Sequence, residues 1–68
     1  MKISARNILQ GKIVAITMGA TTAHVKIDVN GAIVTASITN EAVSELKLEV
    51  GKKAYAVIKS SDIMVAID

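Results

Sequence analysis

The strongest structural signal in this chain is an Asn30-Gly31 pair flanked by two segments that each suit a strand. Hydrophobic and polar residues alternate strictly from Ala23 to Val29, which is typical of a strand with one buried face. Asn-Gly favours a type I′ turn, because both central residues of that turn need a positive φ. With a two-residue loop, Val29 lies opposite Ala32, and every inward-facing pair as far as Ile38 is hydrophobic. The sequence therefore predicts an antiparallel hairpin in this register.

The remaining segments predict three more strands and one helix. Gly11 to Met18 is rich in β-formers and largely apolar, so we expect a strand covered on both faces. From Thr39 to Leu46, a capping residue, an early acid and hydrophobic residues at helical spacing predict about two helical turns. Strand character resumes from Ala54 to Ile58 and again, after a polar interruption, from Ile63 to the C-terminus. This order predicts an all-β domain over residues 1–68, a small five-stranded antiparallel OB-like barrel with one short helix between strands 3 and 4.

The hydrophobic content is high for so short a chain. Hydrophobic residues make up 51% of 68 residues, more than the interior of one small domain can hold. The chain has no cysteine and a single histidine, His24, so neither disulfides nor a structural zinc site can add stability. Association of subunits is the remaining way to stabilise so small a domain, and we therefore expect a homo-oligomer.

Composition also argues against several classes of protein. No apolar run approaches the roughly 20 residues that a membrane-spanning helix needs, and the N-terminus becomes polar too early for a signal peptide. We therefore expect a cytoplasmic protein with no membrane partner. A net charge of +2 suits small anions better than a nucleic-acid backbone, which usually requires a dense basic stripe.

Catalytic and metal-binding patterns are missing from the sequence. His24 has no cysteine and no second histidine to work with, and no phosphate-loop, nucleophile-elbow or zinc-protease motif occurs. Three acids at helical spacing, Glu41, Glu45 and Glu49, suit a solvated helix face. We expect no enzymatic activity, no cofactor and no site for a metal cation.

Two polar clusters stand beside predicted strands, Ser4-Ala5-Arg6-Asn7 and Lys59-Ser60-Ser61. Together they offer two positive charges, several hydroxyl groups and consecutive backbone N–H groups. Hydrogen-bond donors of this kind suit a tetrahedral oxyanion. Each cluster alone is also typical of a polar strand end, so the residues by themselves leave both interpretations open.

The segment from Ile3 to Ile13, ISARNILQGKI, resembles the SARN-x-L-x-G-x-V opening of the Mop family, the molbindins. The same fold forms TOBE-type domains of molybdate transporters and molybdate-responsive regulators. The resemblance spans the whole chain in order and spacing, through Ala23-His24-Val25, Ala36-Ser37-Ile38-Thr39, Leu48-x-x-Gly51 and Ala54-x-Ala56-Val57-Ile58-Lys59-Ser60. At the position of His24, family members often carry an acidic residue.

The resemblance implies a protein that binds molybdate, and usually tungstate, as the intact dianion for intracellular storage, buffering and homeostasis of molybdenum. It implies a hexamer built as a trimer of dimers, with the oxyanion at subunit interfaces. The oxyanion-binding residues that it carries over are Ser4, Ala5 through its backbone, Arg6, Thr39, Lys59 and Ser60. A second candidate oxyanion site would use the turn formed by Gly19, Ala20, Thr21 and Thr22.

Two other functions remain as alternatives. A regulatory module acting in trans on a transporter or transcription factor could use the same oxyanion site as a sensor. An OB-type nucleic-acid-binding domain is less favoured, because such domains stack bases on aromatic side chains and this chain has only Tyr55.

Overall fold

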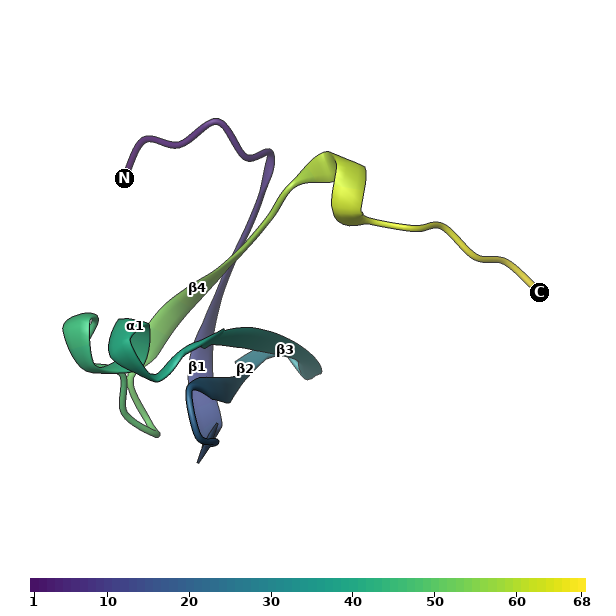
Figure 1. Ribbon diagram of the computed structural model, residues 1–68. Coiled ribbons are helices and arrows are strands. Elements are labelled where there is room, and N and C mark those ends of the chain that lie inside the picture. The colour runs from purple at the N-terminus through teal and green to yellow at the C-terminus, as the bar shows by residue number, and fades with distance from the viewer.

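A computed structural model describes residues 1–68 and shows an antiparallel sheet that curls around its own core (Figure 1). Its four strands are β1 (Asn7–Met18), β2 (Thr22–Val29), β3 (Ala32–Thr39) and β4 (Lys53–Ile58), in the spatial order β3-β2-β1-β4. The helix α1 (Asn40–Glu45) follows β3, and the 3₁₀ turn η1 (Ser60–Asp62) follows β4. No helix has the length and hydrophobicity to cross a membrane.

The predicted hairpin is confirmed in its register. Val29 pairs with Ala32 and Ala23 with Ile38. Both turn residues have a positive φ, 59° at Asn30 and 98° at Gly31. The pairing buries the hydrophobic face of β2 in the core and leaves the polar face, with His24, exposed.

The helix is also confirmed, between a defined start and a defined end. The Thr39 hydroxyl accepts a hydrogen bond of 3.0 Å from the backbone N–H of Ala42, so Thr39 is the N-cap that its sequence position suggested. The helix ends at Leu46 as its C-cap, and Lys47 then takes a positive φ of 53°. Val43 is the buried residue of α1, and it places the helix on the core face of β2.

Strand β1 is longer than predicted and pairs with two neighbours. Its first half, from Asn7, pairs with β4, and its second half pairs with β2. A register shift between Ile13 and Ala15 leaves Val14 without a partner on β2. The prediction of a strand covered on both faces is wrong, because Ile13 is fully buried whereas Val14 is 41% exposed. The apolar run reflects this bulge and not burial on two sides.

The predicted fifth strand is absent from the single chain. Beyond η1, residues 63–68 run away from the sheet and pair with no strand (Figure 1). A strand needs a neighbouring backbone to satisfy its N–H and C=O groups, and the chain turns away from both sheet edges before this segment begins. The five-stranded barrel is therefore wrong for one chain, which forms a curled four-stranded sheet, a half-barrel.

The core of this half-barrel is small. Only six of 68 residues are buried, namely Ile13, Ala23, Val25, Ile27, Val43 and Ala56. Many large hydrophobic side chains stay exposed, including Val65 at 90% and Ile67 at 93% in the C-terminal segment. One chain alone thus leaves many of its large hydrophobic side chains in contact with water.

Gly11 marks the closest approach between β1 and the end of β2. A Cβ at this position would press against the carbonyl oxygen of Asp28 and lie within 2.9 Å of the side chains of Ile27 and Val29. Gly11→Ala is therefore expected to lower the free energy of unfolding by about 2 to 3 kcal/mol, because the strands would have to separate. Chemical denaturation measures this change. Gln10→Ala, at the neighbouring exposed position, is the control and should alter stability by less than about 0.5 kcal/mol; equal effects of the two changes would contradict the prediction.

Candidate functional site

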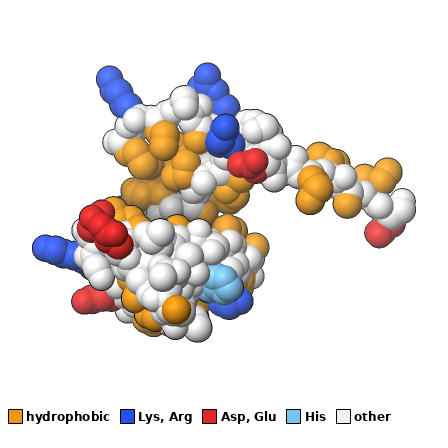
Figure 2. All heavy atoms as spheres, in the orientation of Figure 1, with side chains coloured by type: hydrophobic (Ala, Val, Ile, Leu, Met, Phe, Trp, Pro, Cys, Tyr) orange, Lys and Arg blue, Asp and Glu red, His pale blue; other side chains and the backbone are white.

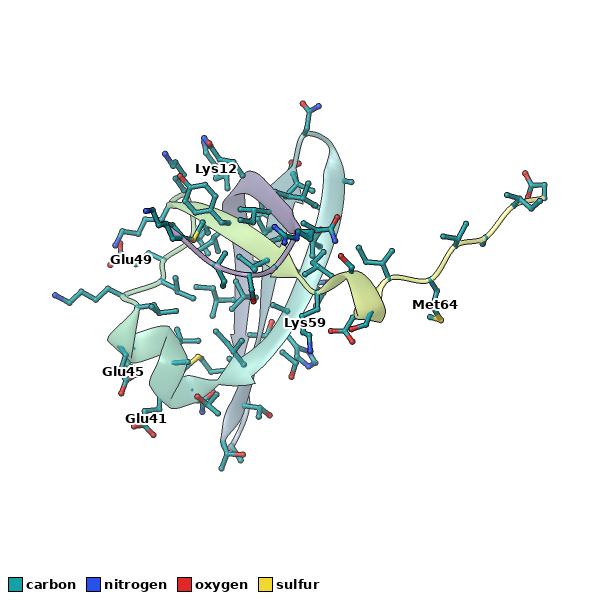
Figure 3. All side chains as sticks on the ribbon, turned by 90° about the horizontal axis from the view of Figure 1, so that it is seen from above. Lys12, Glu41, Glu45, Glu49, Lys59 and Met64 are labelled. Carbon is teal, nitrogen blue, oxygen red and sulfur yellow. The ribbon has the colours of Figure 1, made fainter.

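The two polar clusters of the sequence meet at one end of the β1–β4 ladder. Asn7 is paired with Ile58 in register, and its side-chain amide donates a 3.2 Å hydrogen bond to the carbonyl of Ile58. Arg6 precedes Asn7 and Lys59 follows Ile58, so the antiparallel ladder places these two cations at adjacent positions. Both side chains are exposed, as are Ser4 and Ser60. Figure 3 shows Lys59 at the junction between β4 and η1.

The short turn η1 removes two backbone acceptors from this cluster. The carbonyl of Lys59 accepts a 2.9 Å hydrogen bond from the N–H of Asp62, and the carbonyl of Ser60 accepts one of 3.3 Å from Ile63. Carbonyl oxygens repel an anion, and both are occupied inside the turn. The cluster therefore presents the ammonium of Lys59 and the hydroxyl of Ser60 on its outer side.

Thr39 lies far from the other residues of the first candidate site. It pairs with Thr22, next to the end of β1 that carries Met18, whereas Arg6 and Lys59 lie at the end that carries Asn7. Twelve residues of strand at about 3.3 Å each separate these ends by roughly 30 Å or more. Within one chain, Thr39 cannot contact an anion held by Arg6 and Lys59.

The turn between β1 and β2 is held by the start of α1. The backbone N–H of Asn40 donates to the carbonyl of Thr21 at 2.9 Å, and its side-chain amide donates to the carbonyl of Gly19 at 2.9 Å. Gly19 itself donates to the carbonyl of Thr22 at 2.7 Å. These contacts fix the turn and occupy the carbonyl oxygens of Gly19, Thr21 and Thr22.

A polar hollow of about 210 Å³ lies beside this turn. It is lined by Thr17, Gly19, Thr22 and His24, and by no hydrophobic residue. Of the four turn residues that the resemblance suggested, the structure thus places Gly19 and Thr22 at the hollow, but not Ala20 or Thr21. Sequence reasoning missed Thr17, whose position opposite His24 follows from the pairing of β1 with β2 and not from any local motif.

A larger, apolar groove of about 720 Å³ runs between the two edge strands of the sheet. Residues of β3, such as Val34 and Ile38, line one side, and residues of β4, such as Ala54 and Ile58, line the other. Figure 2 shows hydrophobic side chains gathered in the space between the upper arm of the molecule and its lower body. The groove is open to solvent, so the interior of the half-barrel is exposed between β3 and β4.

The structure brings together no group of three His, Cys, Asp or Glu side chains that could hold a metal ion. Glu41 and Glu45 project from α1, away from Lys59 (Figure 3). The polar groups near Lys59 and in the hollow are mainly hydroxyls, backbone N–H groups and cations, and Asp62 of η1 adds one carboxylate close to Lys59 in sequence. Without a cluster of acids or histidines, this set suits an oxyanion better than a metal cation.

Comparison with known proteins agrees with this chemistry. Residues 3–65 match the TOBE domain family. The chain is 49% identical, over the full length of both proteins, to a probable molybdenum-pterin-binding protein of Haemophilus influenzae. It superposes with a TM-score of 0.94 on a molybdate-binding protein from Sporomusa ovata, at 34% identity over 98% of this chain and 100% of that one. A second similar structure is the cytoplasmic molybdate-binding protein ModG with molybdate bound, at a TM-score of 0.89 and 43% identity over 94% of this chain and 46% of that one.

Proposed function

This chain belongs to the TOBE-domain family of molybdenum-pterin-binding and molybdate-binding proteins, and we propose that it binds molybdate, or tungstate, as the intact dianion. The observation that carries the proposal is the adjacent placement of Arg6, just before β1, and Lys59, just after β4, at one end of the β1–β4 ladder, with Ser4 and Ser60 close by in sequence. Residues 1–68 act as one oxyanion-binding domain, and the protein is a binding protein without catalytic activity.

The proposed site replaces the hydration shell of a dianion with fixed donors. Arg6 offers a planar fork of N–H groups and Lys59 a compact ammonium, while the hydroxyls of Ser4 and Ser60 and the backbone N–H of Ala5 complete the donor set. Each charge-assisted hydrogen bond is worth about 1.5 to 3 kcal/mol, so two cations and a few neutral donors suffice to hold a small dianion. The occupied carbonyls of η1 lower the repulsion that the anion would otherwise meet.

The C-terminal segment supports a dimer in which two chains complete each other. Ile63, Val65 and Ile67 alternate along an extended segment that leaves its own sheet, and the apolar groove lies between two unpaired strand edges. We propose that the segment of each chain enters the groove of the other, between β3 and β4. There it pairs its backbone with both edges and closes the sheet into the five-stranded OB-like barrel. Reciprocal exchange of this kind gives a two-fold symmetric dimer.

The separation of Thr39 from Arg6 and Lys59 supports a site shared between chains. We propose that Thr39 of one copy meets the Arg6–Lys59 cluster of another, in a hexamer built as a trimer of dimers. In this role the protein stores and buffers molybdenum in the cytoplasm. Native mass spectrometry with and without molybdate reports subunit number and bound anions together, and a folded 7.1 kDa monomer that binds molybdate would contradict the shared site.

Selectivity among tetrahedral anions provides the direct test of function. Molybdate and tungstate are expected to bind at least 100-fold more tightly than sulfate or phosphate, because the donor set can be spaced for the larger oxyanion while smaller anions leave donors unpaired. Calorimetric titration of the assembled protein with each anion measures the affinities, and zinc chloride is the control for metal cations. Equal affinity for sulfate and molybdate would overturn the proposed function.

A further inference from the structure

The turn between β2 and β3 joins an asparagine directly to a glycine, and both residues are exposed. Of the three asparagines in the chain, Asn7 and Asn40 each donate a side-chain hydrogen bond to a backbone carbonyl. The side chain of Asn30 makes no hydrogen bond. Its carboxamide is therefore the one that the fold leaves able to turn toward its own backbone.

The residue after each asparagine decides how easily that carboxamide can react. Its carbon is one CH₂ group from the main chain, so the backbone nitrogen of the next residue can attack it and close a five-membered imide. A side chain on that next residue crowds the attack, as Ile8 does after Asn7 and Glu41 after Asn40. Gly31 has no side chain, and a Cβ built there would meet no atom within 4 Å. Only the peptide bond after Asn30 is thus open to attack and to water.

In the folded turn, however, the attacking nitrogen is held by Asp28. The backbone N–H of Gly31 donates a hydrogen bond of 2.8 Å to Oδ1 of Asp28. In a type I′ turn the ψ of the first central residue is about 30°, which places the next nitrogen on the far side of the Cα–C bond from the asparagine side chain. Attack requires rotation about that bond, and the rotation carries the N–H of Gly31 away from Asp28.

We infer that Asn30 is a site of deamidation through a cyclic imide, and that Asp28 slows this modification by holding Gly31 in the turn. The nitrogen of Gly31 forms a bond to Cγ of Asn30, and the bond from Cγ to Nδ2 breaks. The N–H proton passes through water to Nδ2, which leaves as ammonia. Water then opens the imide at either carbonyl and gives aspartate or isoaspartate. Water is the only co-reactant, and the inference does not depend on molybdate binding.

The two products differ in their effect on the hairpin. Aspartate keeps the normal backbone and tolerates the positive φ of this position, which is 59°. Isoaspartate routes the main chain through the side chain and lengthens a loop whose two residues set the register of β2 and β3. Because β2 supplies three buried residues to the core, the isoaspartyl protein is expected to melt below the parent. Asn30→Asp is the control with normal linkage and should melt within a few degrees of it.

Asp28→Ala tests the protective contact. The folded parent and variant are incubated at mildly alkaline pH in water enriched in heavy oxygen, and mass spectrometry of peptides locates each converted asparagine. We expect Asn30 to be converted before Asn7 and Asn40 and to take up the heavy oxygen. Asp28→Ala should convert about two- to tenfold faster, because it loses one hydrogen bond that water replaces only in part.

Val43→Ala is the control for a general loss of stability. Val43 is buried in α1, which follows the end of β3 opposite the turn, so this change weakens the core and leaves the contact between Asp28 and Gly31 in place. Its rate at Asn30 should stay close to that of the parent, since the turn opens locally. Asp28→Ala at the parental rate or slower, or Val43→Ala as fast as Asp28→Ala, would overturn the role of Asp28. If Asn30 is not converted before the other asparagines, or takes up no heavy oxygen, it is not the modification site.

Discussion

Val65→Asp is expected to prevent assembly of the protein and to abolish its cooperative thermal transition. In the single chain Val65 is 90% exposed, so the half-barrel alone predicts almost no effect. In the dimer that we propose, it is the middle one of three side chains that enter the groove of the partner. Burial of each large aliphatic side chain is worth about 1.5 to 3 kcal/mol, and an unpaired carboxylate in that position costs several more. A domain of this size has only a few kcal/mol of stability to lose.

The matched control is Met64→Asp, at the adjacent position. Met64 is 94% exposed, and successive side chains of an extended segment point to opposite sides, so Met64 points away from the side of Val65. This variant should keep the parental oligomer and melt within a few degrees of the parent protein. Native mass spectrometry gives the subunit number and circular dichroism gives the melting temperature. Val65→Asp with parental size and stability would show that the segment stays in solvent and that the groove is filled in another way.

The contrast between the hairpin and the C-terminal segment shows which parts of this fold local sequence can predict. Asn30-Gly31 and the flanking alternation determine the register without reference to the rest of the chain. The alternation of Ile63, Val65 and Ile67 predicts a strand just as clearly, but a strand exists only beside a partner. Nothing in the sequence says that η1 turns the chain away from its own sheet edges. Alternation therefore predicts a strand in this segment that the single chain does not form.

For the candidate site too, the sequence predicts some features and the fold determines the others. Composition selected the two polar clusters, but their adjacency depends on the pairing of Asn7 with Ile58, which are 51 residues apart. Thr39 could be recognised as a helix cap, yet its distance from Lys59 follows only from the strand order. Thr17 carries no motif, and only its register opposite His24 places it at the hollow. Residue types alone therefore cannot predict which of these residues lie together, because that depends on strand pairing between distant parts of the chain.

Arg6→Ala and Lys59→Ala are each expected to weaken molybdate binding by about 2 to 4 kcal/mol, or roughly 30- to 700-fold. Each change removes one of the two adjacent positive charges, and the remaining donors cannot balance a dianion that has left water. Ser4→Ala and Ser60→Ala should cost about 1 kcal/mol each, since water can partly replace a neutral hydroxyl. Calorimetry of variants in the parental oligomer measures these values.

Lys12→Ala is the control for the loss of one positive charge from the same two strands. Lys12 pairs with Lys53 at the far end of the β1–β4 ladder, well removed from Arg6, and it is exposed (Figure 3). Salt screens exposed charges beyond about 8 to 10 Å, so this change should alter molybdate affinity by less than about threefold. The order of effects is then Arg6 and Lys59 first, the two serines next and Lys12 last. If Arg6→Ala and Lys59→Ala stay assembled and bind molybdate like Lys12→Ala, the dianion does not lie between β1 and β4, and the hollow at Gly19 and His24 becomes the principal site.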